Sequence, residues 1–291
     1  MASATEDRFA LVAPGNGSQH SRMRDLVAAR RPDLLELALA EVGEDPYARL
    51  DAGTAYAQPA IFCVSVAALA ELPAGAEPTV VAGHSLGEFA ALVAAGALDA
   101  ADGLRLVALR GRLSQTAAEA APGGMVVLRA QLAVAKEIAD RHGLAVAAEN
   151  APLQTVLSGS EEGLAGAIGE ARERRIRATR PAIDVPFHSP AMAGAAAALA
   201  EALAAVEFAP ARVPVLSGID AEPLSDPRRQ LAEALVRPVR WRAVMEALPG
   251  RGVSRVVETG PGRILTGLAR RTLGDVEAVS LDTATATAAA G

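Results

Sequence analysis

Strands and helices alternate along most of this sequence, and that alternation limits the fold more than any other feature. Short aliphatic runs at residues 8–14, 79–85, 213–219 and 254–260 predict strands, and helical stretches lie between them. Alternating β and α elements favour a parallel sheet with helices packed against it. The sequence therefore predicts an α/β domain built on a parallel sheet.

The alternation is interrupted once, after Pro122-Gly123-Gly124. From there the order is strand, helix, strand, strand, helix, strand over about sixty residues, which is typical of a ferredoxin-like (βαββαβ) unit. We expect a large domain of residues 1–121 and 185–291, with residues 122–184 inserted into it as a small ferredoxin-like subdomain. The cleft between the two is the expected position of a functional site.

The composition excludes several classes of protein. Of the 291 residues, 51% are hydrophobic but only 3% are aromatic, so a core must be built from Ala, Val and Leu. The net charge of -6 argues against nucleic acid as the main partner. Cys63 is the only cysteine, so neither an internal disulfide nor a cysteine metal cluster can form. No signal-like or membrane-spanning apolar run is found, and we expect a cytoplasmic monomer that does not bind membranes.

The stretch "GHSLG" (residues 83–87) places Ser85 between two glycines where a strand meets a helix. One interpretation is a nucleophile elbow, the sharp turn that exposes a serine hydroxyl in α/β-hydrolase-like folds. The alternative is a tight turn that needs glycine only for close packing. The two differ in whether Ser85 has catalytic partners elsewhere in the chain.

A serine nucleophile needs a base, and the chain has four histidines. His84 is adjacent to Ser85, and neighbouring side chains on an elbow point apart. His142 precedes a glycine at a helix end, where a surface imidazole is ordinary. His188 lies between two prolines where the chain returns from the inserted subdomain, which suits a position facing the cleft. His20, after a glycine-rich turn, could also line the cleft, and His188 could equally be a turn residue without chemistry.

Arg110 is unusual within the helix expected over residues 100–120. On a helical wheel Arg105 and Arg112 fall together on one side, whereas Arg110 falls inside the apolar sector. A buried guanidinium must meet an anion or incur a large desolvation cost. That anion would be an internal Asp or Glu, or the carboxylate of a substrate, which suits the bidentate geometry of arginine.

Seven motifs in order resemble the malonyl-CoA:acyl carrier protein transacylase family, which includes the acyltransferase domains of polyketide synthases. The resemblance covers residues 9–273. The motifs are "PGNGSQ" (14–19), "GHSLGE" (83–88), "LRGRLSQ" (109–115), "NAPLQTVLSG" (150–159), "PFHSPAM" (186–192), "PVRW" (238–241) and "ETGPGRILTGL" (258–268).

The resemblance implies a chemistry for these residues. Ser85 would attack the thioester carbonyl of an acyl-CoA while His188 takes its proton, and the backbone N–H groups of Asn16 and Leu86 would form the oxyanion hole. Arg110 would bind the free carboxylate of a malonyl group. The phosphopantetheine thiol of an acyl carrier protein would then take the acyl group, in fatty acid or polyketide biosynthesis. No metal and no permanently bound cofactor is implied.

The resemblance also bears on selectivity. Phe187 and Asn150 would contribute to substrate binding. Phe187 and Leu86 resemble the residues of the malonyl-selective branch of the family rather than those of the methylmalonyl-selective branch. Two positions depart from the family pattern, since Asn16 and Ala234 each replace a glutamine. The family uses a backbone carbonyl at position 234 to orient its histidine, so that change is harmless if only the carbonyl matters. The shorter Asn16 could mark an enzyme specialised for an unusual acyl group.

Several alternatives remain open on the sequence. The same elbow could serve a serine hydrolase or thioesterase, although Arg110 weighs against it. A non-catalytic module that docks a carrier protein is disfavoured by Ser85, His188 and Arg110. The acceptor could also be the carrier subunit of a malonate decarboxylase, or the acyl group another one. Candidate arginines for an acidic carrier protein are Arg172, Arg174, Arg175, Arg177, Arg237, Arg240 and Arg242.

Overall fold

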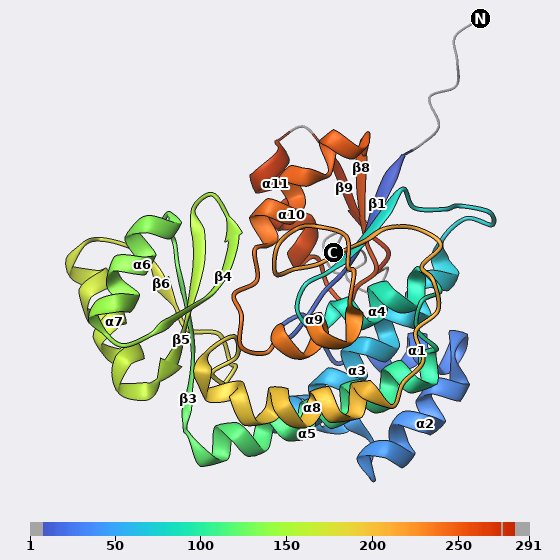
Figure 1. The fold of residues 1–291 in the computed structure, drawn as a ribbon, viewed down its shortest axis with the longest axis horizontal. Coiled ribbons are helices and arrows are strands. Elements are labelled where there is room, and N and C mark those ends of the chain that lie inside the picture. Colours follow the sequence, from blue (N-terminus) through green and yellow to red (C-terminus); the bar gives the residue numbers. More distant parts are fainter. Residues whose placement is uncertain (1–7, 275, 283–291) are drawn as a thin grey trace, which may run out of the picture.

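The structure, a computed structural model, describes residues 8–274 and 276–282 and contains two separate sheets (Figure 1). The larger sheet has the strand order β7-β2-β1-β8-β9, and every pairing in it is parallel. Its central strands β1 and β2 are buried throughout, as expected of aliphatic strands that are covered on both faces. The predicted parallel α/β domain is confirmed. The strands are β1 (Phe9–Ala13), β2 (Val80–Gly83), β7 (Val215–Leu216), β8 (Arg255–Glu258) and β9 (Glu277–Ser280).

Helices surround this sheet, and α3 is buried on nearly all sides because its sequence is apolar all round. The helix α5 begins at an N-cap, since the side chain of Asp99 accepts hydrogen bonds from the backbone N–H groups of Ala101 and Asp102. No helix within the described ranges is both long and apolar enough to cross a membrane. The helices are α1 (Met23–Arg30), α2 (Pro32–Val42), α3 (Thr54–Ala67), α4 (Gly87–Ala94), α5 (Ala100–Ala120), α8 (Ala193–Ala204), α9 (Pro227–Glu233), α10 (Trp241–Ala247) and α11 (Ile264–Leu273).

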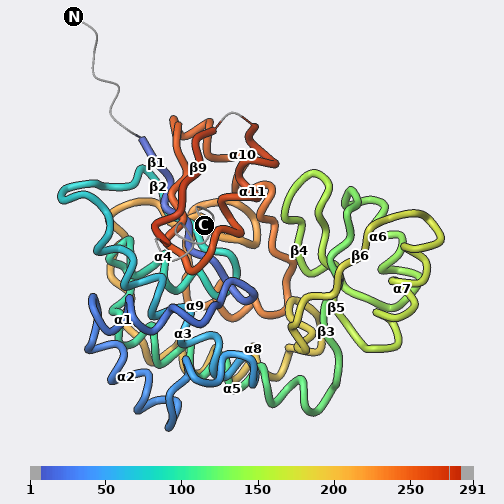
Figure 2. Tube along the Cα trace, turned by 180° about the vertical axis from the view of Figure 1, so that it is seen from behind, coloured from blue at the N-terminus to red at the C-terminus, as the bar shows by residue number. Residues whose placement is uncertain are grey.

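The second sheet is antiparallel, with the order β4-β5-β3-β6. Two helices, α6 and α7, lie on the side of this sheet that faces away from the large domain, as the ribbon and the tube seen from behind both show (Figures 1 and 2). The predicted ferredoxin-like order is confirmed. Its elements are β3 (Gly123–Leu128), α6 (Leu132–Arg141), β4 (Ala145–Ala151), β5 (Gln154–Ser160), α7 (Glu161–Glu173) and β6 (Ala178–Thr179).

Each sheet has its own hydrophobic core, and β3 contributes to both. Val126 and Leu128 pack with α6 and α7, whereas Met125 faces the core of the large domain, because side chains alternate along a strand. The described members of the second core all lie between Val126 and Ala178. We therefore propose residues 122–184 as the inserted subdomain.

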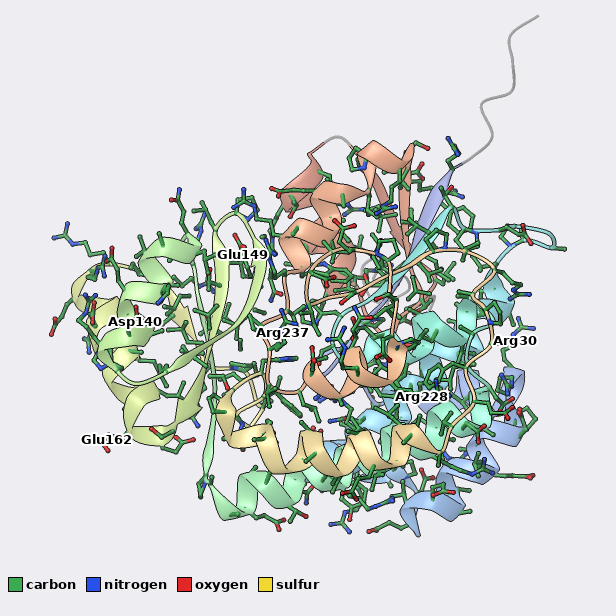
Figure 3. The ribbon with its side chains drawn as sticks, in the orientation of Figure 1. Arg30, Asp140, Glu149, Glu162, Arg228 and Arg237 are labelled. Atoms are coloured by element: carbon green, nitrogen blue, oxygen red, sulfur yellow. The ribbon has the colours of Figure 1, made fainter. Side chains whose placement is uncertain are left out.

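A segment of the large domain adds to the edge of the small sheet and fixes the two parts against each other. Val239 donates a backbone hydrogen bond to Ala147 and accepts one from Glu149, both at 2.9 Å. The carboxylate of Glu149 also pairs with Arg242 of α10 at 3.1 Å, and Figure 3 labels Glu149 on β4. This junction places the end of β4 beside the start of α10.

Candidate active site

Ser85 occupies a strained turn at the end of β2. Its φ of 55° lies in the left-handed region that side chains other than glycine rarely adopt. The flanking glycines are needed for packing, since a Cβ on Gly83 would lie 2.0 Å from the backbone N of Glu88, and one on Gly87 would lie 2.0 Å from the carbonyl oxygen of Ala13. The two interpretations of "GHSLG" are therefore compatible, because close packing holds the elbow that presents a partly exposed Ser85.

Arg110 is buried beside Ser85, with only 1% of its surface exposed. One guanidinium nitrogen donates to Ser85 Oγ at 2.9 Å, and the other donates to Gln58 Oε1 at 2.7 Å. The ring of Phe187 packs 5.5 Å from the guanidinium carbon. Within the described residues no ion pair joins Arg110 to a carboxylate, so the internal ion pair that the sequence left open is not formed.

Gln58 is a site residue that sequence reasoning missed. It is fully buried in α3, where its amide oxygen accepts from Arg110 and its amide nitrogen donates to Thr54 Oγ1 at 2.5 Å. These two contacts fix the direction of the guanidinium group. A signal was present in the sequence, because Gln58 is a long polar side chain within a helix whose residues are mostly apolar.

His188 is held by backbone carbonyls of the segment that follows α9. Its Nδ1 lies 2.7 Å from the carbonyl oxygen of Ala234 and 3.0 Å from that of Arg237. Because carbonyl oxygens only accept hydrogen bonds, Nδ1 carries the proton and Nε2 keeps a free lone pair. The contact at position 234 is made by the main chain, so an alanine there still orients the ring.

Burial also keeps the imidazole of His188 neutral. Loss of solvent, followed by the positive charge of Arg110, lowers the pKa of His188 to about 3. Ser85 and His188 are not hydrogen-bonded to each other here, since Ser85 Oγ accepts from Arg110 instead. The site thus combines a serine on an elbow, a neutral imidazole and a buried cation.

Asn150 lies beside the elbow through its contact with His84. Its Oδ1 is 2.8 Å from Nε2 of His84, and the His84 ring packs 5.4 Å from the ring of Trp241. Asn150 comes from β4 and Trp241 from α10, so His84 is held where the two parts of the molecule meet. The side-chain oxygen of Asn150 thus binds His84.

The other two histidines are engaged elsewhere. His20 Nε2 lies 2.9 Å from the carboxylate of Asp282. His142 Nε2, at the end of α6, lies 3.0 Å from that of Glu170. Of the four histidines, His188 alone has its ring nitrogen bound to main-chain carbonyls near Arg110.

Two backbone N–H groups near Ser85 are available to a ligand. No described residue accepts a hydrogen bond from the N–H of Leu86, which precedes α4, or of Asn16, in the loop after β1. That loop is held by the hydroxyl of Ser18, which donates to the carbonyl of Gly15 at 2.8 Å. The side-chain oxygen of Asn16 is buried and also has no hydrogen-bond partner among the residues that the structure describes.

A cavity of about 510 Å³ opens next to this loop. Asn16, the first turn of α3, the last turns of α5 and the chain segment that leaves the small subdomain form its walls. Among its lining residues are Asn16, Thr54, Ala57, Gln115, Ala118 and Val185.

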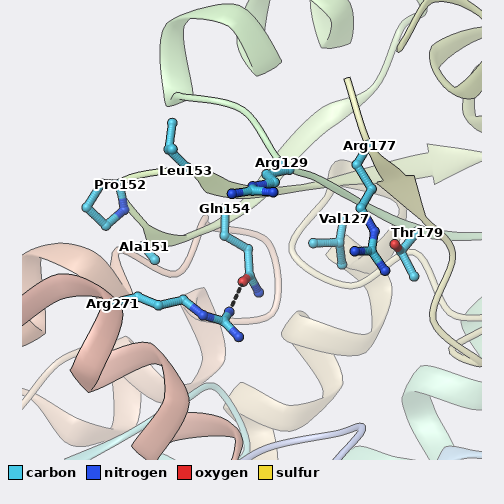
Figure 4. Close-up of a pocket in the computed structure, with 9 residues that line it drawn as sticks. All are labelled: Val127, Arg129, Ala151, Pro152, Leu153, Gln154, Arg177, Thr179 and Arg271. Atoms are coloured by element: carbon cyan, nitrogen blue, oxygen red, sulfur yellow. Dashed lines mark hydrogen bonds between the residues drawn. The ribbon is translucent and has the colours of Figure 1, made fainter. Parts of the chain in front are cut away.

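A second cavity, of about 600 Å³, lies on the face of the small sheet opposite α6 and α7. Arg129, Arg177 and Arg271 point into it (Figure 4), and none of them forms an ion pair within the part of the chain that the structure describes. Arg271 of α11 donates to the side chain of Gln154 at 2.6 Å, and the apolar Leu153 at the rim is 50% exposed. We call Arg129, Arg177 and Arg271 the arginine pocket.

The arginine pocket contains only one of the seven arginines that the sequence suggested, Arg177. Arg174, Arg237 and Arg242 are paired with glutamates, and Figure 3 labels Arg237 next to α9. Arg129 and Arg271 were missed because they come together only in three dimensions.

Comparison with known proteins gives the family. The acyl transferase domain model matches residues 33–287. The malonyl CoA-acyl carrier protein transacylase of Salmonella typhimurium is 35% identical over 97% of this chain and 98% of its own. The crystal structure of malonyl-CoA:acyl carrier protein transacylase from Xanthomonas oryzae has a TM-score of 0.88 at 36% identity, covering 98% of both chains. The acyltransferase domain from the second module of the salinomycin polyketide synthase has a TM-score of 0.84 at 34% identity, covering 95% of this chain and 68% of that one. The chain therefore belongs to the acyl transferase family, among the malonyl-CoA:acyl carrier protein transacylases.

Proposed function

We propose that this protein transfers a malonyl group from coenzyme A to the phosphopantetheine thiol of an acyl carrier protein, in fatty acid or polyketide biosynthesis. The observation that carries the proposal is Arg110, a buried cation that donates to Ser85 Oγ and forms no ion pair with a carboxylate of the described residues, although the charge of Glu88 acts on it from a distance. A buried cation in this position needs an anion next to the nucleophile. The free carboxylate of a malonyl group supplies it, in the bidentate geometry that a guanidinium favours.

The first half-reaction acylates Ser85. The hydroxyl oxygen attacks the thioester carbonyl, and its proton passes to the free Nε2 of His188. The N–H groups of Leu86 and Asn16 stabilise the negative oxygen of the tetrahedral intermediate. As the intermediate collapses, the carbon–sulfur bond breaks and the leaving thiolate takes the proton from His188. The products are free coenzyme A and a malonyl ester on Ser85.

The second half-reaction runs the same steps in the opposite direction. The thiol of the carrier protein gives its proton to His188 and attacks the ester, and the proton then returns to Ser85 Oγ. Because each half-reaction uses the same residues in turn, the kinetics are ping-pong. Arg110 holds the carboxylate of the waiting ester, which favours transfer to a positioned thiol over attack by water.

We propose that the arginine pocket receives the carrier protein. Carrier proteins of this class are acidic, and the pocket offers three guanidinium groups around the exposed side chain of Leu153. Its wall at residues 151–154 directly follows Asn150, which binds His84 next to Ser85. A carrier protein bound there would hold its phosphopantetheine arm beside the elbow.

The proposed function is tested by intact-mass spectrometry after incubation with malonyl-CoA. We expect the wild type to gain the mass of one malonyl group and Ser85→Ala to gain none. Addition of the phosphopantetheinylated carrier protein should remove the label and transfer it to the carrier. Label that persists in Ser85→Ala would refute the nucleophile, and release of free malonate without loading of the carrier would make the protein a hydrolase.

A further inference from the structure

Two buried side-chain oxygens, one in the loop after β1 and one on the helix that carries Arg110, have no hydrogen-bond partner among the described residues. They are Oδ1 of Asn16 and Oγ of Ser114, and Ser114 is fully buried. Buried polar atoms are almost always hydrogen-bonded, because an unpaired one loses its contacts with water and gains nothing in return. A ligand with a matching polar group would satisfy both atoms.

Ser114 lies on α5, and its neighbours Gln115 and Ala118 on that helix line the cavity next to Asn16. On a helical wheel Ser114 lies about 40° from Arg110 and Ala118 lies about 80° from it, so the three residues form one stripe. Arg110 contacts Ser85 at one end of the stripe, while Ala118 lines the 510 Å³ cavity at the other. Asn16 lines the same cavity. Ser114 therefore lies on this stripe of α5 between Arg110 and Ala118.

The proposed function, on which this inference rests, fixes where each part of a malonyl group sits. Its thioester carbonyl faces the N–H groups of Asn16 and Leu86, and its carboxylate faces Arg110. The α-carbon joins these two groups, so a substituent on it lies between Asn16 and Ser114. The ring of Phe187 packs over the guanidinium of Arg110, and Ser114 lies one helical turn from Arg110 on the same face of α5.

We propose that the acyl site is selective for a malonyl group that carries a hydroxyl on its α-carbon. The hydroxyl donates to Oδ1 of Asn16 and accepts from the hydroxyl of Ser114, so that both buried atoms are paired. A neutral hydroxyl fits this position better than an ammonium group, because the charge of Arg110 would repel a second buried cation. A methyl group of the same size leaves both oxygens unpaired.

The experiment compares the loading of Ser85 from hydroxymalonyl-CoA and methylmalonyl-CoA, which differ only by a hydroxyl in place of a methyl group. In the wild type we expect kcat/KM for hydroxymalonyl-CoA to exceed that for methylmalonyl-CoA by about 10-fold or more, because a site built for a hydroxyl rejects an analogue that lacks it. In Ser114→Ala this ratio should fall about 10-fold, whereas Ser114→Thr, which keeps the hydroxyl, should retain a preference.

The matched control is Ser158→Ala in β5, since Ser158 is also a fully buried serine whose hydroxyl has no partner among the described residues. Its ratio should equal that of the wild type. A wild-type ratio near one, or an unchanged ratio in Ser114→Ala, would overturn the inference. Each ratio is measured within one protein, so it does not depend on how much of that protein is folded.

Loading from malonyl-CoA separates this inference from the proposed function. If malonyl loads but the ratio is near one, only the hydroxyl selectivity fails, and if no thioester loads Ser85, the proposed function fails with it.

Discussion

At the residue scale, burial lowers the pKa of both Arg110 and His188, yet it leaves these two groups in different charge states at neutral pH. Burial lowers the pKa of Arg110 only to about 10, so the guanidinium stays positive at neutral pH. The same loss of solvent lowers the pKa of His188 to about 3, which leaves the imidazole neutral. The site is therefore ready to bind an anion and to accept a proton at the same pH.

Arg110→Ala tests the first of these roles. The variant should load malonyl-CoA more slowly by roughly 30- to 4,000-fold, because removing one partner of a buried, hydrogen-bonded charge pair costs about 2–5 kcal/mol. Loading from acetyl-CoA, which has no free carboxylate, should fall little. The measurement is the malonyl-to-acetyl ratio of Ser85 loading, with Arg105→Ala on the same helix as control, since Arg105 is exposed and pairs with Asp102. An unchanged ratio together with a lower melting temperature would assign Arg110 a structural role.

The pH dependence of loading tests the second role. A base with a pKa of about 3 is already unprotonated at pH 5, so the single-turnover rate of Ser85 acylation should change by less than about twofold between pH 8 and pH 5. A histidine with an ordinary pKa near 6.5 would instead lose most of its base form across this range. Rapid-quench loading followed by intact-mass analysis gives the rate. A decline of about tenfold between pH 7.5 and pH 5.5 would contradict a depressed pKa for the base.

At the scale of elements, α4 is joined to the loop after β7 by one buried carboxylate. Glu88, in the first turn of α4, accepts a hydrogen bond from the backbone N–H of Gly218 at 2.6 Å. Burial raises the pKa of Glu88 to about 7, and this is only partly opposed by that hydrogen bond and by the charge of Arg110. The contact keeps the start of α4, and with it the elbow, in place against the loop.

Glu88→Gln should make stability less dependent on pH. The folded state keeps a proton on Glu88 up to about pH 7, whereas the unfolded state loses it near pH 4.5, so the free energy of unfolding falls as pH rises from 4.5 to 7. Glutamine keeps an acceptor for Gly218 but does not titrate, and the decline should shrink by about 3 kcal/mol. Part of the decline in the free energy of unfolding should remain in the variant, since burial also raises the pKa of Glu258 to about 7. Urea unfolding at pH 4.5 and pH 7 measures the difference, and an identical decline in both proteins would show that folding does not raise the pKa of Glu88.

At this scale the sequence could predict only the features that neighbouring residues determine. The turn at Ser85 and the apolar face that contains Arg110 are encoded within a few consecutive residues, and the structure has both. His188 is held by the main-chain carbonyls of Ala234 and Arg237. Such main-chain contacts leave no pattern of side chains in the sequence, so the contact with Arg237 could not be predicted. The expectation for Ala234 came only from the family resemblance. Gln58 left a weak signal, a long polar side chain in a mostly apolar helix.

At the scale of the whole molecule, the site depends on how the inserted subdomain meets the large domain. The backbone pairing of Val239 with β4 and the ion pair between Glu149 and Arg242 hold the two parts together. The order of elements predicted both parts, because that order follows from local periodicity. It could not predict the junction, which joins residues about ninety positions apart, and so it could not predict which arginines gather beside it.

The arginine pocket is the feature of the assembled molecule whose role is easiest to measure. Arg129 follows β3, Arg177 precedes β6 and Arg271 belongs to α11, so the three reach one cavity only when both parts are in place (Figure 4). The double variant Arg129→Ala/Arg177→Ala should raise KM for the carrier protein by about 10-fold or more, because it removes two of three cations that face an acidic partner. The effect of this double variant on loading from malonyl-CoA should be far smaller. The KM of the wild type for the carrier protein should rise with salt more steeply than that of the variant.

The control for loss of charge alone is Lys136→Ala on α6, where Lys136 pairs with Asp140 on the outer side of the subdomain. Equal losses in both half-reactions would assign the pocket to coenzyme A, and no loss in either would leave the three arginines without a role in transfer.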